Sequence, residues 1–256
     1  MKRKFYIPIL VLCLCLYGCL GPWGTIDVLY ESLITIYENV DYGGNVEVRS
    51  YPLQNRNHVV SVKIPTEVYA HYYLRADGWN EHFKQINPDW EIWHERHREL
   101  SRKNGDVGFD RYVDVSNGPF MHCVWNTDNL MTAMSIVSNA DFDETHPAGT
   151  PLDDIVEITY YSYKSIIEND YALPEGRYCH SDCHYSVTKL LSEFESEDSL
   201  FMESTCSFWT INEYSFWLEV VQEPTLAMQH TFTVTIEFEH SEPYSFSFDM
   251  DFTSAE

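Results

Sequence analysis

The sequence predicts a mainly β protein, an antiparallel β-sandwich-like domain with two short inserted helices. Most apolar segments are short and are separated by turn residues, such as the run 41–45. Two segments near the C-terminus, 231–239 and 244–252, alternate strictly between apolar and polar residues. Of the 256 residues, 44% are hydrophobic and 15% aromatic, which is enough apolar material for a packed core.

In the N-terminal half, the clearest expected strand is 59–64, because Val60, Val62 and Ile64 alternate with polar residues. Pro65 is expected to end this strand and separate it from the next one. The strands expected in this half are 26–37, 46–51, 59–64, 67–74, 110–115 and 121–125.

The first inserted helix is expected after Pro88, where Asp89 can cap its first turn. One face of this helix is aromatic and apolar and consists of Trp90, Trp93, His97 and Leu100. Five basic residues lie in the segment Arg96–Arg111. We expect them to pair with nearby glutamates; docking of an acidic partner is the alternative.

The C-terminal half returns to strands, and its last two are joined by residues 240–243 as a hairpin. Acidic residues on the outer face of this hairpin are expected to oppose edge pairing. The second inserted helix is expected to begin at Ser186, with an apolar face of Val187, Leu190, Leu191 and Phe194. The strands expected here are 130–137, 156–161, 200–209, 214–221, 231–239 and 244–252.

A long polar loop, 139–151, separates two of these strands. Asp141, Asp143 and Glu144 could supply oxygen ligands to Ca²⁺. The EF-hand pattern is absent, however, because His146-Pro147 stands where its glycine should fall. We therefore expect solvated loop acids and no bound metal.

The first eighteen residues have the pattern of a secretory signal peptide. Lys2, Arg3 and Lys4 precede the apolar stretch Phe5–Leu16. A helix of twelve residues is about 18 Å long, much shorter than the roughly 30 Å of a bilayer core. Residues 1–18 are therefore expected to be removed.

The end of this stretch, Leu16-Tyr17-Gly18-Cys19, resembles the lipobox of bacterial lipoproteins. The resemblance implies cleavage before Cys19 and acylation of that cysteine with fatty acids such as palmitate. Leu20 follows, which by the same resemblance favours the outer membrane, with the chain facing the periplasm or the cell surface. An ordinary cleaved signal peptide is the alternative. Residues 19–25 would form a lipidated tether and residues 26–256 a β-rich ectodomain, with a split into two β subdomains near residue 117 left open.

Four cysteines remain after processing, and an oxidising compartment favours disulfides between them. They are Cys123, Cys179, Cys183 and Cys206. Three pairings are possible, and spacing does not choose among them. The alternative is a zinc site built from Cys179, His180, Cys183 and His184, but the Cys-x₃-Cys spacing is not that of paired zinc knuckles.

The charge excludes one class of function. Sixteen basic and forty acidic residues give a formal charge of −24, and removal of the three basic leader residues makes it −27. Such a chain repels phosphate backbones, so nucleic-acid binding is not expected.

Three common catalytic or nucleotide-binding motifs are absent from the sequence: a Gly-x-Ser-x-Gly elbow, a glycine-rich phosphate loop and a His-Glu-x-x-His helix. We expect no cofactor.

Segments 141–150, 154–163 and 190–194, together with the closing hairpin, are similar to a group of uncharacterised secreted lipoproteins of gut-type Gram-negative bacteria. The similarity covers roughly residues 120–252. It implies a place in the cell envelope and no particular activity.

The function expected from all this is a non-catalytic binding or assembly module, whose partner is a glycan, a peptide or another envelope protein. A secreted glycan-active or other hydrolytic enzyme is the alternative. Exposed aromatic rings would favour a sugar ligand. The aromatic clusters are Tyr69/Tyr72/Tyr73, Trp90/Trp93 and Tyr160/Tyr161/Tyr163.

Overall fold

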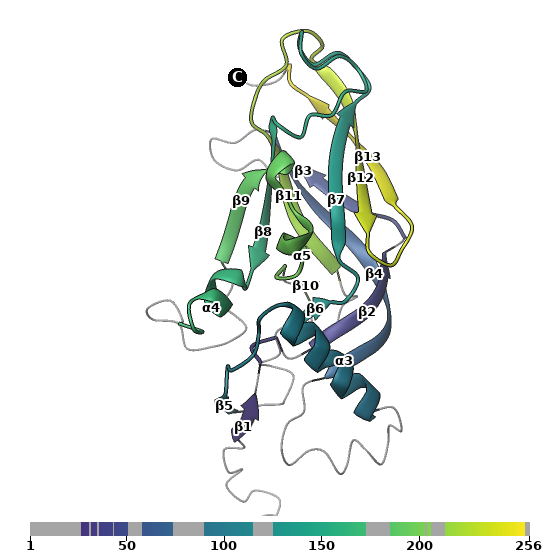
Figure 1. The fold of residues 1–256 in the computed structure, drawn as a ribbon. Coiled ribbons are helices and arrows are strands. Elements are labelled where there is room, and N and C mark those ends of the chain that lie inside the picture. Colours follow the sequence, from purple (N-terminus) through teal and green to yellow (C-terminus); the bar gives the residue numbers. More distant parts are fainter. Residues whose placement is uncertain are drawn as a thin grey trace, which may run out of the picture.

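The fold is seen in a computed structural model (Figure 1). The structure describes residues 27–30, 32–34, 36–42, 44–50, 58–73, 90–114, 125–172, 185–202, 204–205 and 213–253. The predicted fold class is confirmed: the described chain is mainly β and sandwich-like, with its strands largely antiparallel. No helix among the described residues is both long and apolar enough to cross a membrane.

The larger sheet has the strand order β6-β2-β4-β11-β8-β9, with β3 also paired to β4 and β10 to β11. Neighbouring strands are antiparallel, except that β2 and β6 are parallel. Its strands are β2 (Ile36–Tyr42), β3 (Glu47–Ser50), β4 (Val59–Tyr73), β6 (Trp125–Thr127), β8 (Val156–Ser162), β9 (Tyr185–Leu190), β10 (Ser204–Thr205) and β11 (Glu213–Val220).

The smaller sheet has the order β13-β12-β7, and β12 and β13 form the predicted hairpin. In their register Ile236 lies opposite Tyr244 and Phe232 opposite Phe248. A separate antiparallel pair joins β1 (Asp27–Tyr30) to β5 (Arg111–Asp114). The strands of the smaller sheet are β7 (Met131–Ser138), β12 (Gln229–Phe238) and β13 (Tyr244–Asp251).

The main core lies between these two sheets and follows from the alternation read in the sequence. Alternate residues of β12 are buried, while the residues between them are partly or fully exposed. The fully buried side chains of this core include Val62, Ile64, Ile158, Phe216, Ile136, Phe232, Val234 and Ile236. Because every second residue of a strand points to the same face, each sheet presents one apolar surface to the other.

A second core lies beside the larger sheet and includes residues of α3 (Trp90–Lys103) and α4 (Lys164–Glu168). The short helix α5 (Ser196–Ser199) ends just before Phe201, which also belongs to this core. The first predicted helix, α3, is confirmed, and it buries His94, His97 and Leu100 while Glu95 and Glu99 face the solvent. Both cores contain residues from before and after position 117. The second core consists of Leu33, Ile34, Tyr37, Leu100, Phe109, Tyr163, Ile166, Ile167, Tyr171 and Phe201.

The predicted break at Pro65 is wrong, because β4 runs through it from Val59 to Tyr73. The hydrogen-bond ladder with β3 ends at Lys63, and the ladder with β2 begins at Thr66. Pro65 lies in the gap between the two ladders, where a missing N–H group costs little. The turn expected between β2 and β3 is present, and Gly44 adopts a φ of 90° there.

The predicted helix from Ser186 to Phe194 is also wrong. Residues 185–190 form β9, in which Val187 lies opposite Tyr160 and Thr188 opposite Thr159 of β8. Only Leu191–Glu193 is helical, as the 3₁₀ turn η3. Val187 and Thr188 are β-branched and favour a strand, so the helix-like spacing came from a strand followed by a turn.

Candidate functional site

Two loops meet at the end of the sandwich that lies away from β1 and β5 (Figure 1). The first, residues 139–155, joins β7 to β8, and the second, residues 221–228, joins β11 to β12. Backbone N–H groups of Thr225 and Leu226 donate to the carbonyl oxygen of Phe142 at 2.9 and 3.2 Å. Phe142 is fully buried. These two segments, called the apical loops below, therefore fold as one unit.

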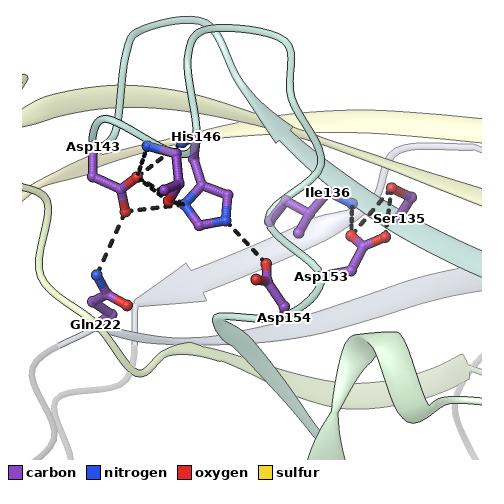
Figure 2. Close-up of polar contacts among 8 residues, drawn as sticks. Ser135, Ile136, Asp143, His146, Asp153, Asp154 and Gln222 are labelled. Carbon is purple, nitrogen blue, oxygen red and sulfur yellow. Dashed lines mark hydrogen bonds and ion pairs between the residues drawn. The ribbon is translucent and has the colours of Figure 1, made fainter.

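The carboxylate of Asp143 organises the first apical loop (Figure 2). Its Oδ1 accepts hydrogen bonds from the N–H and hydroxyl of Thr145, both at 2.7 Å, and from the N–H of His146 at 2.8 Å. Its Oδ2 lies 3.5 Å from the side-chain amide of Gln222 in the second loop. The Thr145 hydroxyl and the His146 ring hold the pKa of this carboxyl well below its usual range.

His146 lies between two carboxylates. Its Nδ1 is 2.9 Å from both oxygens of Asp143, and its Nε2 is 3.1 Å from Oδ1 of Asp154. The side chains of His146 and Asp143 are 11% and 10% exposed, while that of Asp154 is 64% exposed. The hydrogen bond to Asp143, with a further one to Asp154, raises the pKa of His146 above its ordinary value despite burial.

Asp153, the neighbour of Asp154, has a different role. Its Oδ1 accepts a 2.9 Å hydrogen bond from the backbone N–H of Ile136, and both of its oxygens accept from the Ser135 hydroxyl (Figure 2). The backbone N–H of Leu152 also donates to the carbonyl of Ile136 at 2.9 Å. The turn before β8 is therefore fixed to β7 independently of His146.

A buried histidine supports the loops from below. His230 is 3% exposed; its Nε2 donates to the carbonyl of Ala227 at 2.8 Å, and its Nδ1 lies 2.7 Å from the Ser138 hydroxyl. Its ring centroid is 5.2 Å from that of Phe142 and 5.5 Å from that of Phe232. Both ring nitrogens thus have hydrogen-bond partners inside the protein, which is typical of a structural histidine.

A shallow groove of about 550 Å³ lies beside His230, at the apical end of the β12–β13 hairpin. Thr231 donates to Asp249 at 2.7 Å, and Gln229 donates to Asp251 at 3.1 Å. Besides His230, the groove is lined by Asn139, Gln229, Thr231, Asp249, Met250 and Asp251. The groove is therefore polar and acidic.

Exposed apolar side chains lie on the second apical loop, which leads into β12. Val221, Leu226 and Met228 of the second apical loop are 48%, 54% and 39% exposed. They are three of the six large hydrophobic residues of the described chain that face solvent to this extent. A mixture of exposed apolar and charged groups on one loop pair is typical of a surface that contacts a protein.

The chemistry of the His146 cluster is that of a structural bridge. Both ring nitrogens are occupied by carboxylates, so neither faces a substrate as a general base would. The acids considered as calcium ligands accept hydrogen bonds from their own loop, since Asp141 binds the N–H of Ala148 at 2.8 Å and Asp143 binds Thr145 and His146. Within the described ranges, no group of three or more histidine, cysteine or acidic side chains is arranged to hold a metal ion.

The second core contains a buried polar network that the sequence did not reveal. Asp106, fully buried, accepts hydrogen bonds from the backbone N–H groups of Leu33 and Ile34 at 2.8 and 2.7 Å. His97 lies 3.0 Å from the carbonyl of Ile34 through Nε2, and Asn104 donates to the Tyr37 hydroxyl at 2.7 Å. Burial raises the pKa of Asp106 to about 6 and lowers that of His97 to about 3.

The basic segment around α3 is paired within the molecule, as expected. Arg96 contacts Glu99 at 3.2 Å. Arg98 contacts Glu95 at 3.3 Å, and Lys103 contacts Glu239 at 3.2 Å. Among the basic side chains of this segment that the structure describes, at least these three have acidic partners, which leaves less charge for an acidic partner protein.

The aromatic cluster Tyr160/Tyr161/Tyr163 gives little support to a sugar platform. Tyr160 and Tyr163 are each 1% exposed. Tyr161 is partly exposed but meets Trp217 edge-on, with ring planes at 80° and centroids 5.4 Å apart. A stacking platform needs coplanar exposed rings, and this pair is not coplanar.

The cysteine predictions lie outside the described residues. This holds for the lipidation site Cys19, for the disulfide candidates Cys123, Cys179, Cys183 and Cys206, and for His180 and His184. These assignments stay predictions.

Sequence reasoning named Asp143 and the His146-Pro147 step but did not connect His146 with Asp154. One signal was available: Asp143 precedes His146 by three residues in a polar turn, a spacing at which an Asp side chain readily binds the following backbone. The contact with Asp154 depends on how the turn before β8 folds back, and no local pattern encodes it.

We compared the chain with protein-family models, curated proteins and solved structures, and none of them matches it.

Proposed function

We propose that this chain is a lipid-anchored protein of the bacterial cell envelope, acylated at Cys19, whose β domain is a non-catalytic binding module. The basic start, short apolar stretch and lipobox-like ending of residues 1–19 support the anchor. An acyl-anchored cysteine with two or more chains binds a bilayer stably. Leu20 after the cysteine favours the outer membrane.

The observation that carries the binding role is the surface of the apical loops. It combines exposed Leu226 and Met228 with the acidic groove at Asp249 and Asp251. The apical loops lie at the end of the domain away from β1, the first described strand after Cys19 (Figure 1). A domain tethered through its N-terminus would therefore present this surface away from the membrane.

The chemistry of this surface favours a protein or peptide partner with apolar and basic side chains. Carboxylates in the groove suit lysine or arginine, and Leu226 and Met228 of the second apical loop suit an apolar contact. The same carboxylates disfavour phosphate-rich or acidic partners. The coplanar exposed rings that a glycan platform requires are not seen at Tyr160, Tyr161 and Tyr163.

The anchor can be tested by metabolic labelling with a palmitate analogue. Replacing Cys19 with Ala should abolish the label and move the protein out of the membrane fraction. Cys15→Ala, within the apolar leader, is the matched control and should keep both. Persistent labelling of the Cys19→Ala protein would contradict the proposed anchor.

The binding role can be tested by crosslinking in intact cells followed by detergent extraction. The double variant Leu226→Asp, Met228→Asp should lose crosslinked products that the wild-type protein forms. Ile92→Asp is the control, because Ile92 is 68% exposed on α3, away from the apical loops. Identical products from all three proteins would argue against the apical loops as the binding surface.

A further inference from the structure

We propose that His146 and Asp154 form a proton-dependent latch, which holds the tip of the first apical loop, residues 141–150, against the last turn of the same loop, residues 152–155, only while His146 is doubly protonated. This goes beyond the proposed binding role, since it concerns the state of the loop and not its partner. The latch is the contact between Nε2 of His146 and Oδ1 of Asp154, 3.1 Å long (Figure 2).

The geometry requires two protons on the ring. A carboxylate that is ionised can only accept hydrogen bonds, and His146 has one carboxylate at each nitrogen. An imidazolium ring donates from both nitrogens and satisfies both acceptors. A neutral ring has one N–H and must turn a lone pair toward the other carboxylate.

The two carboxylates do not compete equally for the remaining proton. Asp143 is about a tenth exposed and approaches Nδ1 with both oxygens at 2.9 Å, whereas Asp154 is 64% exposed and approaches Nε2 with one oxygen. The buried, two-oxygen contact is the stronger one. The proton therefore leaves from Nε2, and the neutral form is the Nδ1–H tautomer.

Loss of that proton affects only one side of the cluster. Asp143 keeps its hydrogen bonds from the N–H groups of Thr145 and His146, which do not titrate. Asp154 faces a lone pair instead of a donor, and its exposed side chain turns to water. The turn that carries it stays in place, because Asp153 remains bound to Ile136 of β7.

The charged groups that face His146 set the direction of the pH response. Asp143 and Asp154 are the two carboxylates at the ring, and the second apical loop contributes the neutral Gln222 beside Asp143. Both carboxylates raise the pKa of His146, so the latch is closed below this raised pKa and opens as the pH rises through it. Acidic surroundings would stiffen the first apical loop.

The direct test is a ¹⁵N-histidine NMR titration of the full chain in detergent micelles, with the His146 signal assigned by its absence in His146→Gln. We expect a pKa above that of an exposed histidine and a neutral form protonated at Nδ1. A neutral form protonated at Nε2 would overturn the proposal, because Asp154 would then still have its donor.

Hydrogen exchange of the segment 141–150, corrected for the intrinsic effect of pH, tests the mechanical consequence. In the wild type, exchange should rise several-fold as the pH passes the His146 pKa. Asp154→Asn should lower the pKa of His146 and remove most of this rise, while Glu144→Gln, an exposed acid in the same loop, should change neither. An unchanged pH response in Asp154→Asn would refute the latch, and since Asp154 is exposed, this variant is expected to fold.

Discussion

The Oδ1 atom of Asp106 accepts a 2.8 Å hydrogen bond from the backbone N–H of Leu33, which lies 73 residues earlier in the chain. The other oxygen binds the N–H of Ile34 at 2.7 Å. One buried side chain thus replaces the strand partner that this short segment lacks.

Replacing Asp106 with Ala should lower the free energy of unfolding by about 2–4 kcal/mol, because two buried N–H groups lose their acceptor. Urea denaturation at pH 7 measures this change. Glu99→Ala is the control: its side chain is 60% exposed and makes a surface ion pair with Arg96, so the change should stay below about 0.5 kcal/mol. Equal losses of unfolding free energy in the two variants would show that the hydrogen bonds of Asp106 do not stabilise the fold.

The effect of Asp106→Ala should also depend on pH. The folded protein holds the proton of Asp106 more tightly than the unfolded chain does, because burial raises its pKa from 3.8 to about 6. The wild type therefore gains stability from this group as the pH falls from 7 toward 4. The difference between wild type and variant should be larger at pH 5 than at pH 7, and a smaller difference at pH 5 would contradict the assigned pKa direction.

His97 should have the opposite pH dependence. Burial lowers its pKa from 6.5 to about 3, so between these pH values the ring is protonated in the unfolded chain but not in the folded protein. Between pH 7 and pH 5 this should cost the wild type about 2 kcal/mol of stability. His97→Gln can still donate to the carbonyl of Ile34 but does not titrate, so its stability should fall less over this range. Chemical denaturation at both pH values measures the free energy of unfolding of the two proteins. An equal loss in wild type and variant between pH 7 and pH 5 would show that His97 does not cause the pH dependence.

Asp198 should be a second buried carboxylate that stabilises the fold through its hydrogen bonds. It accepts hydrogen bonds from the Tyr160 hydroxyl at 2.8 Å, from Lys189 at 2.9 Å and from the backbone N–H of Glu195 at 2.8 Å. Asp198→Ala should lower the melting temperature and cost about 2–3 kcal/mol, because it removes a charge-assisted network and a helix cap. Glu197→Ala, one residue away and 70% exposed, should have little effect in the same calorimetric measurement.

The acids of the last strand should keep the protein from self-association. β13 is one of the two edge strands of the smaller sheet, and both Asp249 and Asp251 are exposed on it. The double variant Asp249→Thr, Asp251→Thr should form concentration-dependent oligomers in light scattering, since an uncharged edge strand can pair with another copy. Glu237→Thr on β12 is the control, because that strand is paired on both sides. A monomeric double variant would show that these acids do not protect the edge.

Alternation along single strands made most of the fold predictable. Strands such as 59–64 and the closing hairpin need only local pattern, because one buried face imposes a period of two residues. The helix α3 was predictable for the same reason, since its aromatic face recurs at helical spacing. Where two elements adjoin, as at Leu190-Leu191, the combined spacing imitated a helix that does not form.

The site was less predictable because its contacts depend on how irregular loops fold and not on a repeating pattern. The loop acids were visible as a polar turn, but the pairing of His146 with Asp154 requires the turn before β8 to fold back. The bond from Asp106 to Leu33 is harder still, since it closes a separation of 73 residues. Single-sequence patterns record which face of an element is buried, not which distant side chain meets it.

The long strand β4 has a consequence for how the protein unfolds. Its first half, through residue 65, pairs with β3 and β11 over the main core, and its second half pairs with β2, which supplies Tyr37 to the second core. Neither core therefore has a backbone framework of its own. Melting one would strip strand partners from the other, so the two should be lost together in a single cooperative transition.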